Sequence, residues 1–358
     1  MKSVFDEITL GNIQVQNRLV RSATFESGAD AEGRYDQKMF DLYRKLADGG
    51  VGLIITGMVG VDANSRIAPS MVKTYNDTFT ERLRQLTELV HDHGSRLVIQ
   101  LAHCGIKVSK TDSGEPPLGI SSLPGQNIRE MSKEDLYRLA DSFADAALRC
   151  KKAGADGVQM HAAHGYLLSQ ALSPIFNKRT DDYGGSLEKR AKLLFDVYKS
   201  IRDAVGDDYP VWIKINSSDL VDGGLTLDES QAICEQLSKA GMDAIEVSGG
   251  IAVSKESLPM KGVRDAQQEG YFYKEAVSIA GKVEADTDVI SVGGYRTPEL
   301  LERKLNEGNF KGFSLCRPFI VEPGLANRWR SGQMEKAKCI SCNRCFAPGE
   351  LSCKQRTV

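Results

Sequence analysis

The feature that most constrains the fold is a pattern repeated eight times, in which a short apolar run is followed by an amphipathic segment. Near-continuous apolar runs are typical of parallel strands that are covered on both faces. Eight strand-then-helix units predict an α/β fold, the (β/α)8 TIM barrel. A doubly wound sheet is the alternative, and we prefer the barrel because the units follow one another without a linker. The runs are residues 19–24, 52–58, 97–102, 157–161, 211–216, 244–248, 289–293 and 312–316.

The segments between the runs carry helix signals. Apolar residues recur every three or four positions between 187 and 201, as on one buried helical face. Thr226 and Glu229 have the spacing of a capping box, and Thr297 precedes a proline, Pro298, in a first helical turn. These signals support a helix after each strand.

Composition excludes several classes of protein. A length of 358 residues is normal for a single α/β barrel, and 41% hydrophobic residues are enough for a large core. The formal net charge is −2 and the sequence has no basic block, so we expect no nucleic-acid partner. The first residues, MKSVFDEITLGNIQ, show no secretory signal, and no run reaches the ~18 apolar residues that span a bilayer. We therefore expect a cytoplasmic protein with no membrane partner.

A cluster of ionisable side chains follows the fourth apolar run. Active sites of such barrels lie at the carboxyl ends of the strands. There, His161 and His164 can donate hydrogen bonds to one oxyanion, and Tyr166 can deliver a proton to a neighbouring atom. The alternative is a pair of core or metal-binding histidines beside a packing tyrosine.

The loops after the seventh and eighth runs resemble a phosphate site. Barrels often bind phosphate there, and Gly293, Gly294, Cys316 and Arg317 provide close backbone approach and a positive charge. Two tight turns are the alternative. The sequence contains neither GxGxxG nor GxxxxGK[ST], which argues against a Rossmann dinucleotide site and a P-loop.

Two polar residues lie within the apolar runs themselves. Gln100 ends the third run and Lys214 lies in the fifth. A buried amine is costly unless it is paired, and a bound anion or an electron-rich heterocycle is a natural partner. A salt bridge from Lys214 to a carboxylate such as Glu246 is the alternative.

With these residues the chain resembles the old yellow enzyme family, the NADH:flavin oxidoreductases with a 2,4-dienoyl-CoA reductase-like FMN barrel. The resemblance covers about residues 1–330. The motifs that carry it are NRLVRSAT (17–24), QLAHCG (100–105), HAAHGYLLSQALSPIFNKRTDDYGGS (161–186), VGG (292–294) and RPF (317–319).

The resemblance implies an FMN at the barrel rim, and matches residues to roles one by one. His161 and His164 match the pair that holds a substrate carbonyl oxygen, and Tyr166 matches the proton donor. The positions that match cofactor contacts are Ala23 and Thr24 on strand one, Gly57 on strand two, Gln100 and Lys214 at the flavin ring, and Gly293, Gly294, Cys316 and Arg317 at the phosphate.

The implied activity is an NAD(P)H:flavin oxidoreductase of the ene-reductase type. NADH or NADPH reduces the flavin, and flavin N5 then passes hydride to an activated C=C bond of an enone- or enoate-type substrate while Tyr166 protonates it. Familiar branches have Pro and then Thr or Cys two residues later in strand one, where this chain has Ala23 and Phe25. Two alternatives stay open: a Schiff-base lyase that uses Lys214, and a non-catalytic flavin or iron–sulfur electron-transfer protein.

Four cysteines crowd the end of the chain in the pattern C-x2-C-x2-C-x7-C: Cys339, Cys342, Cys345 and Cys353. In a reducing compartment such a cluster indicates metal binding rather than disulfides. We divide the chain into a barrel, 1–332, and a cysteine-rich tail, 333–358.

The tail also resembles the CxGCNxxC region of the larger family branch, the 2,4-dienoyl-CoA and 2-enoate reductases, which implies one [4Fe–4S] cluster. The next gap is two residues rather than three, so zinc or a vestigial tail are the alternatives. We expect no second flavin domain, because the sequence stops at Val358. Further partners on this interpretation are an electron-donor protein and a second copy in a homo-oligomer.

Overall fold

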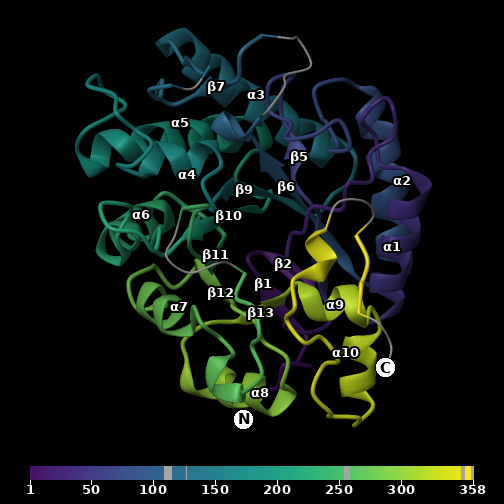
Figure 1. Ribbon diagram of the computed structural model, residues 1–358. Coiled ribbons are helices and arrows are strands. Elements are labelled where there is room, and N and C mark those ends of the chain that lie inside the picture. The colour runs from purple at the N-terminus through teal and green to yellow at the C-terminus, as the bar shows by residue number, and fades with distance from the viewer. Residues whose placement is uncertain (109–114, 126, 254–258, 348–350, 356–358) are drawn as a thin grey trace.

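A closed barrel of eight parallel strands forms the centre of the computed structural model, with helices packed around it (Figure 1). The structure describes residues 1–108, 115–125, 127–253, 259–347 and 351–355. Each strand pairs with the next along the chain, and the last pairs with the first. The predicted (β/α)8 barrel is confirmed. Its strands are β3 (Leu19–Arg21), β4 (Leu53–Ile55), β6 (Arg96–Ala102), β9 (Gly157–Ala162), β10 (Val211–Asn216), β11 (Ala244–Ser248), β12 (Asp288–Val292) and β13 (Gly312–Leu315).

At least one helix connects each strand to the next, and two of them, α4 and α5, lie between β9 and β10. The predicted capping box is present at α6, where Thr226 and Glu229 each accept a hydrogen bond from the other's backbone N–H. Thr297 precedes α8, but its hydroxyl donates to Glu269 (2.9 Å) rather than capping the helix. The connecting helices are α1 (Gln37–Asp48), α2 (Thr78–Asp92), α3 (Lys133–Lys152), α5 (Leu187–Val205), α6 (Leu227–Lys239), α7 (Tyr273–Ala280) and α8 (Pro298–Glu307), and α9 (Arg317–Val321) and α10 (Leu325–Arg330) follow β13.

A hairpin of β1 (Ile8–Leu10) and β2 (Ile13–Val15) fills the amino-terminal end of the barrel. Its Leu10, Ile13 and Val15 join an apolar cluster with inward-facing strand residues, and the indole N–H of Trp212 donates to the carbonyl of Gly11 (3.0 Å). The smaller elements are β5 (Val59–Gly60), β7 (Leu118–Gly119), β8 (Arg129–Glu130), α4 (Leu167–Leu172), and the 3-10 turns η1 (Gly105–Lys107), η2 (Ala266–Gln268) and η3 (Arg344–Phe346).

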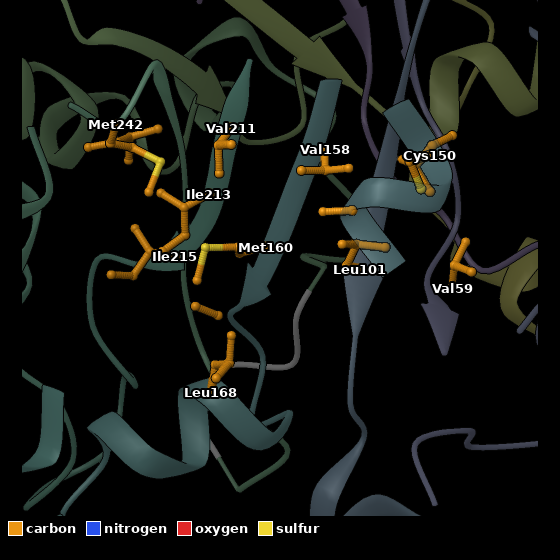
Figure 2. Packing of buried hydrophobic residues seen from close by; sticks show 14 of the residues in the cluster. Val59, Leu101, Cys150, Val158, Met160, Leu168, Val211, Ile213, Ile215 and Met242 are labelled. Carbon is orange, nitrogen blue, oxygen red and sulfur yellow. The ribbon is translucent and has the colours of Figure 1, made fainter. Parts of the chain in front are cut away.

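Strand alternation decides which side chains face the barrel interior. Val158 and Met160 of β9 belong to the apolar layer between strands and helices, as do Ile213 and Ile215 of β10 (Figure 2). Because successive side chains of a strand point to opposite faces, the residues between them point inward. Those residues are Gln159, His161, Trp212 and Lys214. The register sets Lys214 beside His161 on one side and beside Glu246 on the other.

Candidate active site

A cavity of about 610 Å³ lies at the carboxyl ends of the barrel strands. It is lined by residues that follow most of the strands, as expected for this fold. The predicted catalytic residues His161, His164 and Tyr166 all line it. So do seven of the nine predicted cofactor residues: Ala23, Thr24, Gln100, Lys214, Gly294, Cys316 and Arg317.

The other two predicted cofactor residues, Gly57 and Gly293, pack against backbone and side chains that surround the cavity. A Cβ at Gly57 would lie 1.9 Å from a carboxylate oxygen of Glu26 and 2.4 Å from the carbonyl of Thr24. Gly293 has φ +148° and its carbonyl accepts from the N–H groups of Gly270 (2.6 Å) and Tyr271 (3.2 Å). Both glycines therefore permit close packing at the site.

A chain of buried polar side chains runs beneath the cavity. Gln100 Nε2 donates to Gln159 Oε1 (2.8 Å), and Gln159 Nε2 donates to Glu246 Oε2 (3.0 Å). The Lys214 ammonium donates to Glu246 Oε1 (3.0 Å) and Ser22 Oγ (2.8 Å). Burial raises the pKa of Glu246, but Lys214 and the hydrogen bonds outweigh burial and hold that pKa below its usual value. Lys214 thus lines the cavity and also makes the salt bridge that was the alternative interpretation.

The two histidines face each other with ring centroids 5.4 Å apart. The Ala163 N–H donates to His161 Nδ1 (3.4 Å), which leaves the proton of His161 on Nε2. His164 Nε2 lies 2.7 Å from Ser248 Oγ, and donation by that hydroxyl leaves Nδ1–H free to act as a donor.

Both imidazoles are neutral near pH 7. Burial lowers the pKa of His161 well below its usual value, with further lowering by the charges of His164, Lys214 and Lys107. Burial, followed by the charges of Lys214 and Lys107, lowers the pKa of His164 to about 3. The pair can donate hydrogen bonds but adds no net charge to the cavity.

A left-handed turn brings Tyr166 to the same wall. His164 has φ +60° and Gly165 has φ +74°, a conformation that is uncommon for a residue with a side chain. The His164 N–H donates to Asn216 Oδ1 (3.0 Å), and its carbonyl accepts from Lys107 Nζ (2.6 Å). These two bonds offset the strain of the turn.

The Tyr166 ring lies against His161, with ring centroids 4.7 Å apart. Lys107 Nζ lies 4.3 Å from the centroid of the Tyr166 ring. Burial, and then the nearby Cys104, raise the pKa of Tyr166 above its usual value, so the phenol is protonated at neutral pH. A buried, protonated phenol beside two neutral donors suits proton delivery.

A buried ion pair anchors the loop after β3. Arg21 Nη2 lies 2.9 Å from Glu26 Oε1, which also accepts from the Tyr43 hydroxyl (3.1 Å). Between these anchors, Thr24 Oγ1 lies 3.0 Å from Cys316 Sγ. Phe25 lines the cavity, so an apolar side chain stands where familiar branches carry Thr or Cys.

The tail folds back along α9 and reaches the same cavity (Figure 1). Its Cys345 and Phe346 line the cavity. Two arginines of the barrel hold it: Arg317 Nη1 donates to Asn343 Oδ1 (2.7 Å), and Arg296 Nη1 donates to the carbonyl of Cys339 (2.7 Å).

All four tail cysteines are among the residues that line a second, much smaller cavity, together with Arg317. Among the residues that the structure describes, no three Cys, His, Asp or Glu side chains come together as a site for a metal ion. The thiols therefore share one space without forming the tight ligand set of a single ion. The same finding speaks against His161 and His164 as part of a metal site within the described ranges.

Comparison with known sequences identifies the family. The sequence profile of the NADH:flavin oxidoreductase / NADH oxidase family matches residues 3–336. The chain belongs to this family. The resemblance inferred from the motifs is therefore confirmed.

Relatives of this NADH:flavin oxidoreductase family member include oxidases, dehydrogenases and reductases. The NADH oxidase of Thermoanaerobacter brockii is 33% identical over 348 residues, which are 95% of this chain and 53% of the relative. The NADPH dehydrogenase of Halalkalibacterium halodurans is 33% identical over 317 residues, 88% of this chain and 91% of the relative. The cinnamate reductase of Clostridium sporogenes is 30% identical over 370 residues, 95% of this chain and 55% of the relative. The chain spans about half the length of the first curated relatives it matches.

Solved structures agree with the family assignment. A 2-naphthoyl-CoA reductase in complex with 2-naphthoyl-CoA superposes with a TM-score of 0.87 at 26% identity, covering 98% of this chain and 56% of the other. An old yellow enzyme homologue from Zymomonas mobilis gives a TM-score of 0.79 at 23% identity, covering 94% of each chain, and shows the shared fold. Within the described ranges, no helix of this family member has the length and apolarity needed to cross a bilayer.

The motif analysis missed several residues of the site. Ser248 and Asn216 orient His164, and both end apolar runs, so their position at a strand end was the available signal. Lys107 follows β6 in η1; its place after a predicted strand was visible in the sequence, but no motif gave it a role at the site. Phe346 reaches the cavity from the tail, which no local pattern predicts.

Proposed function

We propose that the chain is an FMN-dependent oxidoreductase that uses NADH or NADPH to reduce an activated C=C bond of an enone- or enoate-type substrate. The observation that carries the proposal is the convergence of His161, His164 and Tyr166 on one wall of a cavity that Gln100 and Lys214 also line. Two neutral donors beside a protonated phenol suit the reduction of an alkene conjugated to a carbonyl.

The cavity residues fit FMN at both ends. At the ring end, Gln100 supplies an amide and Lys214 a positive charge. At the phosphate end, Gly294 and Arg317 line the cavity beside Ser314, whose buried hydroxyl has no hydrogen-bond partner among the described residues. An orphaned buried hydroxyl is costly, and a ligand at this end would satisfy it.

FMN bound there would supply hydride chemistry, taking hydride from the nicotinamide and passing it from N5 to the substrate β-carbon. The chain's own residues do the rest. His161 Nε2–H and His164 Nδ1–H donate to the substrate oxygen and stabilise the negative charge that develops on it. Tyr166 gives its proton to the α-carbon and regains one from solvent.

The first test is the identity of the bound cofactor. Flavin released by denaturation and separated by chromatography is expected to be FMN; finding no flavin, or finding FAD, contradicts the proposal. Anaerobic protein reduced with NADH or NADPH is then expected to be reoxidised by an enone or a 2-enoate. The cinnamate reductase among the relatives, which bears the name of such an acid, supports the choice of probe.

The two alternatives predict different results. A Schiff-base lyase needs a free amine, whereas Lys214 is paired with the buried carboxylate of Glu246. Borohydride trapping of a substrate on Lys214 would restore the lyase interpretation. A non-catalytic electron carrier would hold flavin but leave the alkene unreduced.

We also propose that Cys339, Cys342, Cys345 and Cys353 bind one metal centre, a [4Fe–4S] cluster in preference to zinc. The support is the spacing C-x2-C-x2-C-x7-C and the single small cavity that all four cysteines line. Four closely spaced thiolates are typical ligands of an iron–sulfur cluster, and they also suit zinc. An electron-donor protein and a homo-oligomer, as well as a cytoplasmic location, stay predictions.

A further inference from the structure

We propose that Lys107 is an anion-binding residue of the substrate pocket, and that it makes 2-enoic acids, bound as carboxylates, the preferred substrate class. This inference rests on the proposed function, because it assigns the substrate of the same site.

Lys107 lies beside the proposed catalytic residues. It ends η1, the turn directly after β6, and its side chain lines the cavity. Its Nζ donates to the carbonyl of His164 (2.6 Å) and lies 4.3 Å from the centroid of the Tyr166 ring. The ammonium therefore stands next to both groups that handle the reacting part of a substrate.

The other ionisable groups of the cavity are neutral or already have partners. His161 and His164 are neutral, and the charge of Lys214 is balanced by Glu246 at 3.0 Å. Arg317 lies at the opposite end, where its guanidinium donates to Asn343 Oδ1 and the carbonyl of Met260 (2.7 Å each).

Lys107 makes no ion pair with a carboxylate among the residues that the structure describes, and only one of its three ammonium protons is assigned to an acceptor there. Burial lowers the pKa of this amine, which reflects the cost of a charge without a counter-charge. A carboxylate ligand would supply the counter-charge and accept the remaining protons. The substrate side of the pocket is thus built for an anion.

The two substrate classes differ in the charge that develops on them. Hydride addition to the β-carbon of an enone gives an enolate with one negative charge, which neutral donors can stabilise. The same addition to an enoate, already an anion, gives an enediolate with two charges. The neutral histidines can donate hydrogen bonds to one oxygen of the enediolate, and a cation is needed to stabilise the second negative charge on the other oxygen. Tyr166 then protonates the α-carbon, and the product is the saturated carboxylate.

The test compares two probes of one skeleton in the flavin-loaded protein: 3-phenylprop-2-enoate and its methyl ketone, 4-phenylbut-3-en-2-one. Binding is measured by calorimetry without a nicotinamide, so that it needs no turnover. Lys107→Met keeps the length of the side chain and removes the charge. It is expected to weaken binding of the acid about 10- to 100-fold, the loss of a hydrogen bond to a charged group, and to change binding of the ketone less than threefold.

Lys107→Arg is expected to restore most of the acid binding, because it keeps the charge. The matched control is Lys199→Met, which removes an exposed lysine of α5 that pairs with Asp203, and it should change binding of neither probe.

Three outcomes overturn the inference. If Lys107→Met weakens binding of both probes equally, Lys107 only stabilises the turn from His164 to Tyr166. If binding of the acid is unchanged, Lys107 does not bind the anion. A loss that falls on reduction by NADH or NADPH instead would assign the lysine to the dinucleotide. A protein that binds the acid through Lys107 but reduces neither probe would refute the proposed function and the substrate assignment, and would leave Lys107 as an anion-binding residue. One that reduces the ketone without a Lys107-dependent preference for the acid would refute this inference alone.

Discussion

The buried pair of Lys214 and Glu246 gives the sharpest prediction about stability. The side chains of Lys214 and Glu246 are 5% and 0% exposed, and Lys214 Nζ lies 3.0 Å from Glu246 Oε1. Removing one partner of such a pair leaves a buried charge and costs ~3–5 kcal/mol. Lys214→Met leaves the carboxylate with donors from Ser22 and Gln159, which places the loss near the lower figure. Glu246→Gln leaves the ammonium with neutral acceptors only, which places the loss near the upper figure.

The double variant Lys214→Met/Glu246→Gln removes both charges and keeps most of the neutral hydrogen bonds. Its loss is expected to stay below ~3 kcal/mol, well under the ~6–10 kcal/mol sum of the two single losses, because no buried charge is left unpaired. The measurement is urea unfolding at pH 7 of protein freed of bound ligand, since a ligand that binds the native state alters apparent stability. Lys199→Met, in an exposed pair, is the control and should shift stability by less than ~1 kcal/mol.

The pH dependence of the same variants has a definite sign. The pKa of Glu246 is held below its usual value of 4.5 in the folded protein, so its charge stabilises the fold above that pH. That stabilisation is lost as the pH falls through the folded pKa. The difference in the free energy of unfolding between the native protein and Glu246→Gln should therefore be largest at pH 7 and should decrease below about pH 4.5. Additive single losses, or single losses within 1 kcal/mol of the native protein, would refute the coupling.

Three further results are expected at the site and the tail. Tyr166→Phe should leave flavin reduction by NAD(P)H nearly intact and slow alkene reduction ~10²–10⁴-fold; equal slowing of both half-reactions in stopped flow would contradict its role as proton donor. Replacing His161 and His164 together by Ala should weaken phenolate binding by roughly 1.5–3 kcal/mol for each bond lost, and an unchanged titration of the flavin spectrum would exclude the pair as the anion site. Truncation at Gln333 should spare FMN and abolish the tail metal, whereas anaerobic material with neither iron nor zinc by elemental analysis would leave the cysteines without that role.

The barrel could be predicted from sequence because its signals are local and repeated. Residues 211–216 and 244–248 match β10 and β11, since fully buried parallel strands appear as unbroken apolar runs. The run 52–58 was less accurate, because β4 ends at Ile55 and the next strand, β5, begins only at Val59, after the run. Between the two strands, the Gly57 N–H donates to the Tyr43 hydroxyl of α1 (3.3 Å), a partner that no local pattern indicates.

Much of the site was also predictable, since seven proposed cofactor positions and three proposed catalytic ones line a single cavity. What escaped depends on contacts between distant segments. The sequence placed Lys107 after a strand but did not show that its amine meets the carbonyl of His164, 57 residues later. Its position after the last strand suggested that the tail can fold back near the cofactor, but the sequence did not show the contacts with Arg296 and Arg317 that hold it there.

The hairpin that fills the amino-terminal end of the barrel has a consequence for kinetics. Leu10, Ile13 and Val15 pack together with Trp212 and close the amino-terminal end of the barrel. Small molecules therefore reach the cavity from the carboxyl-terminal end. In the proposed reaction, the nicotinamide and the alkene would then enter through the same end and bind in turn, each excluding the other. An excess of either reactant should therefore slow the cycle, with double-reciprocal plots that run parallel as in a ping-pong sequence.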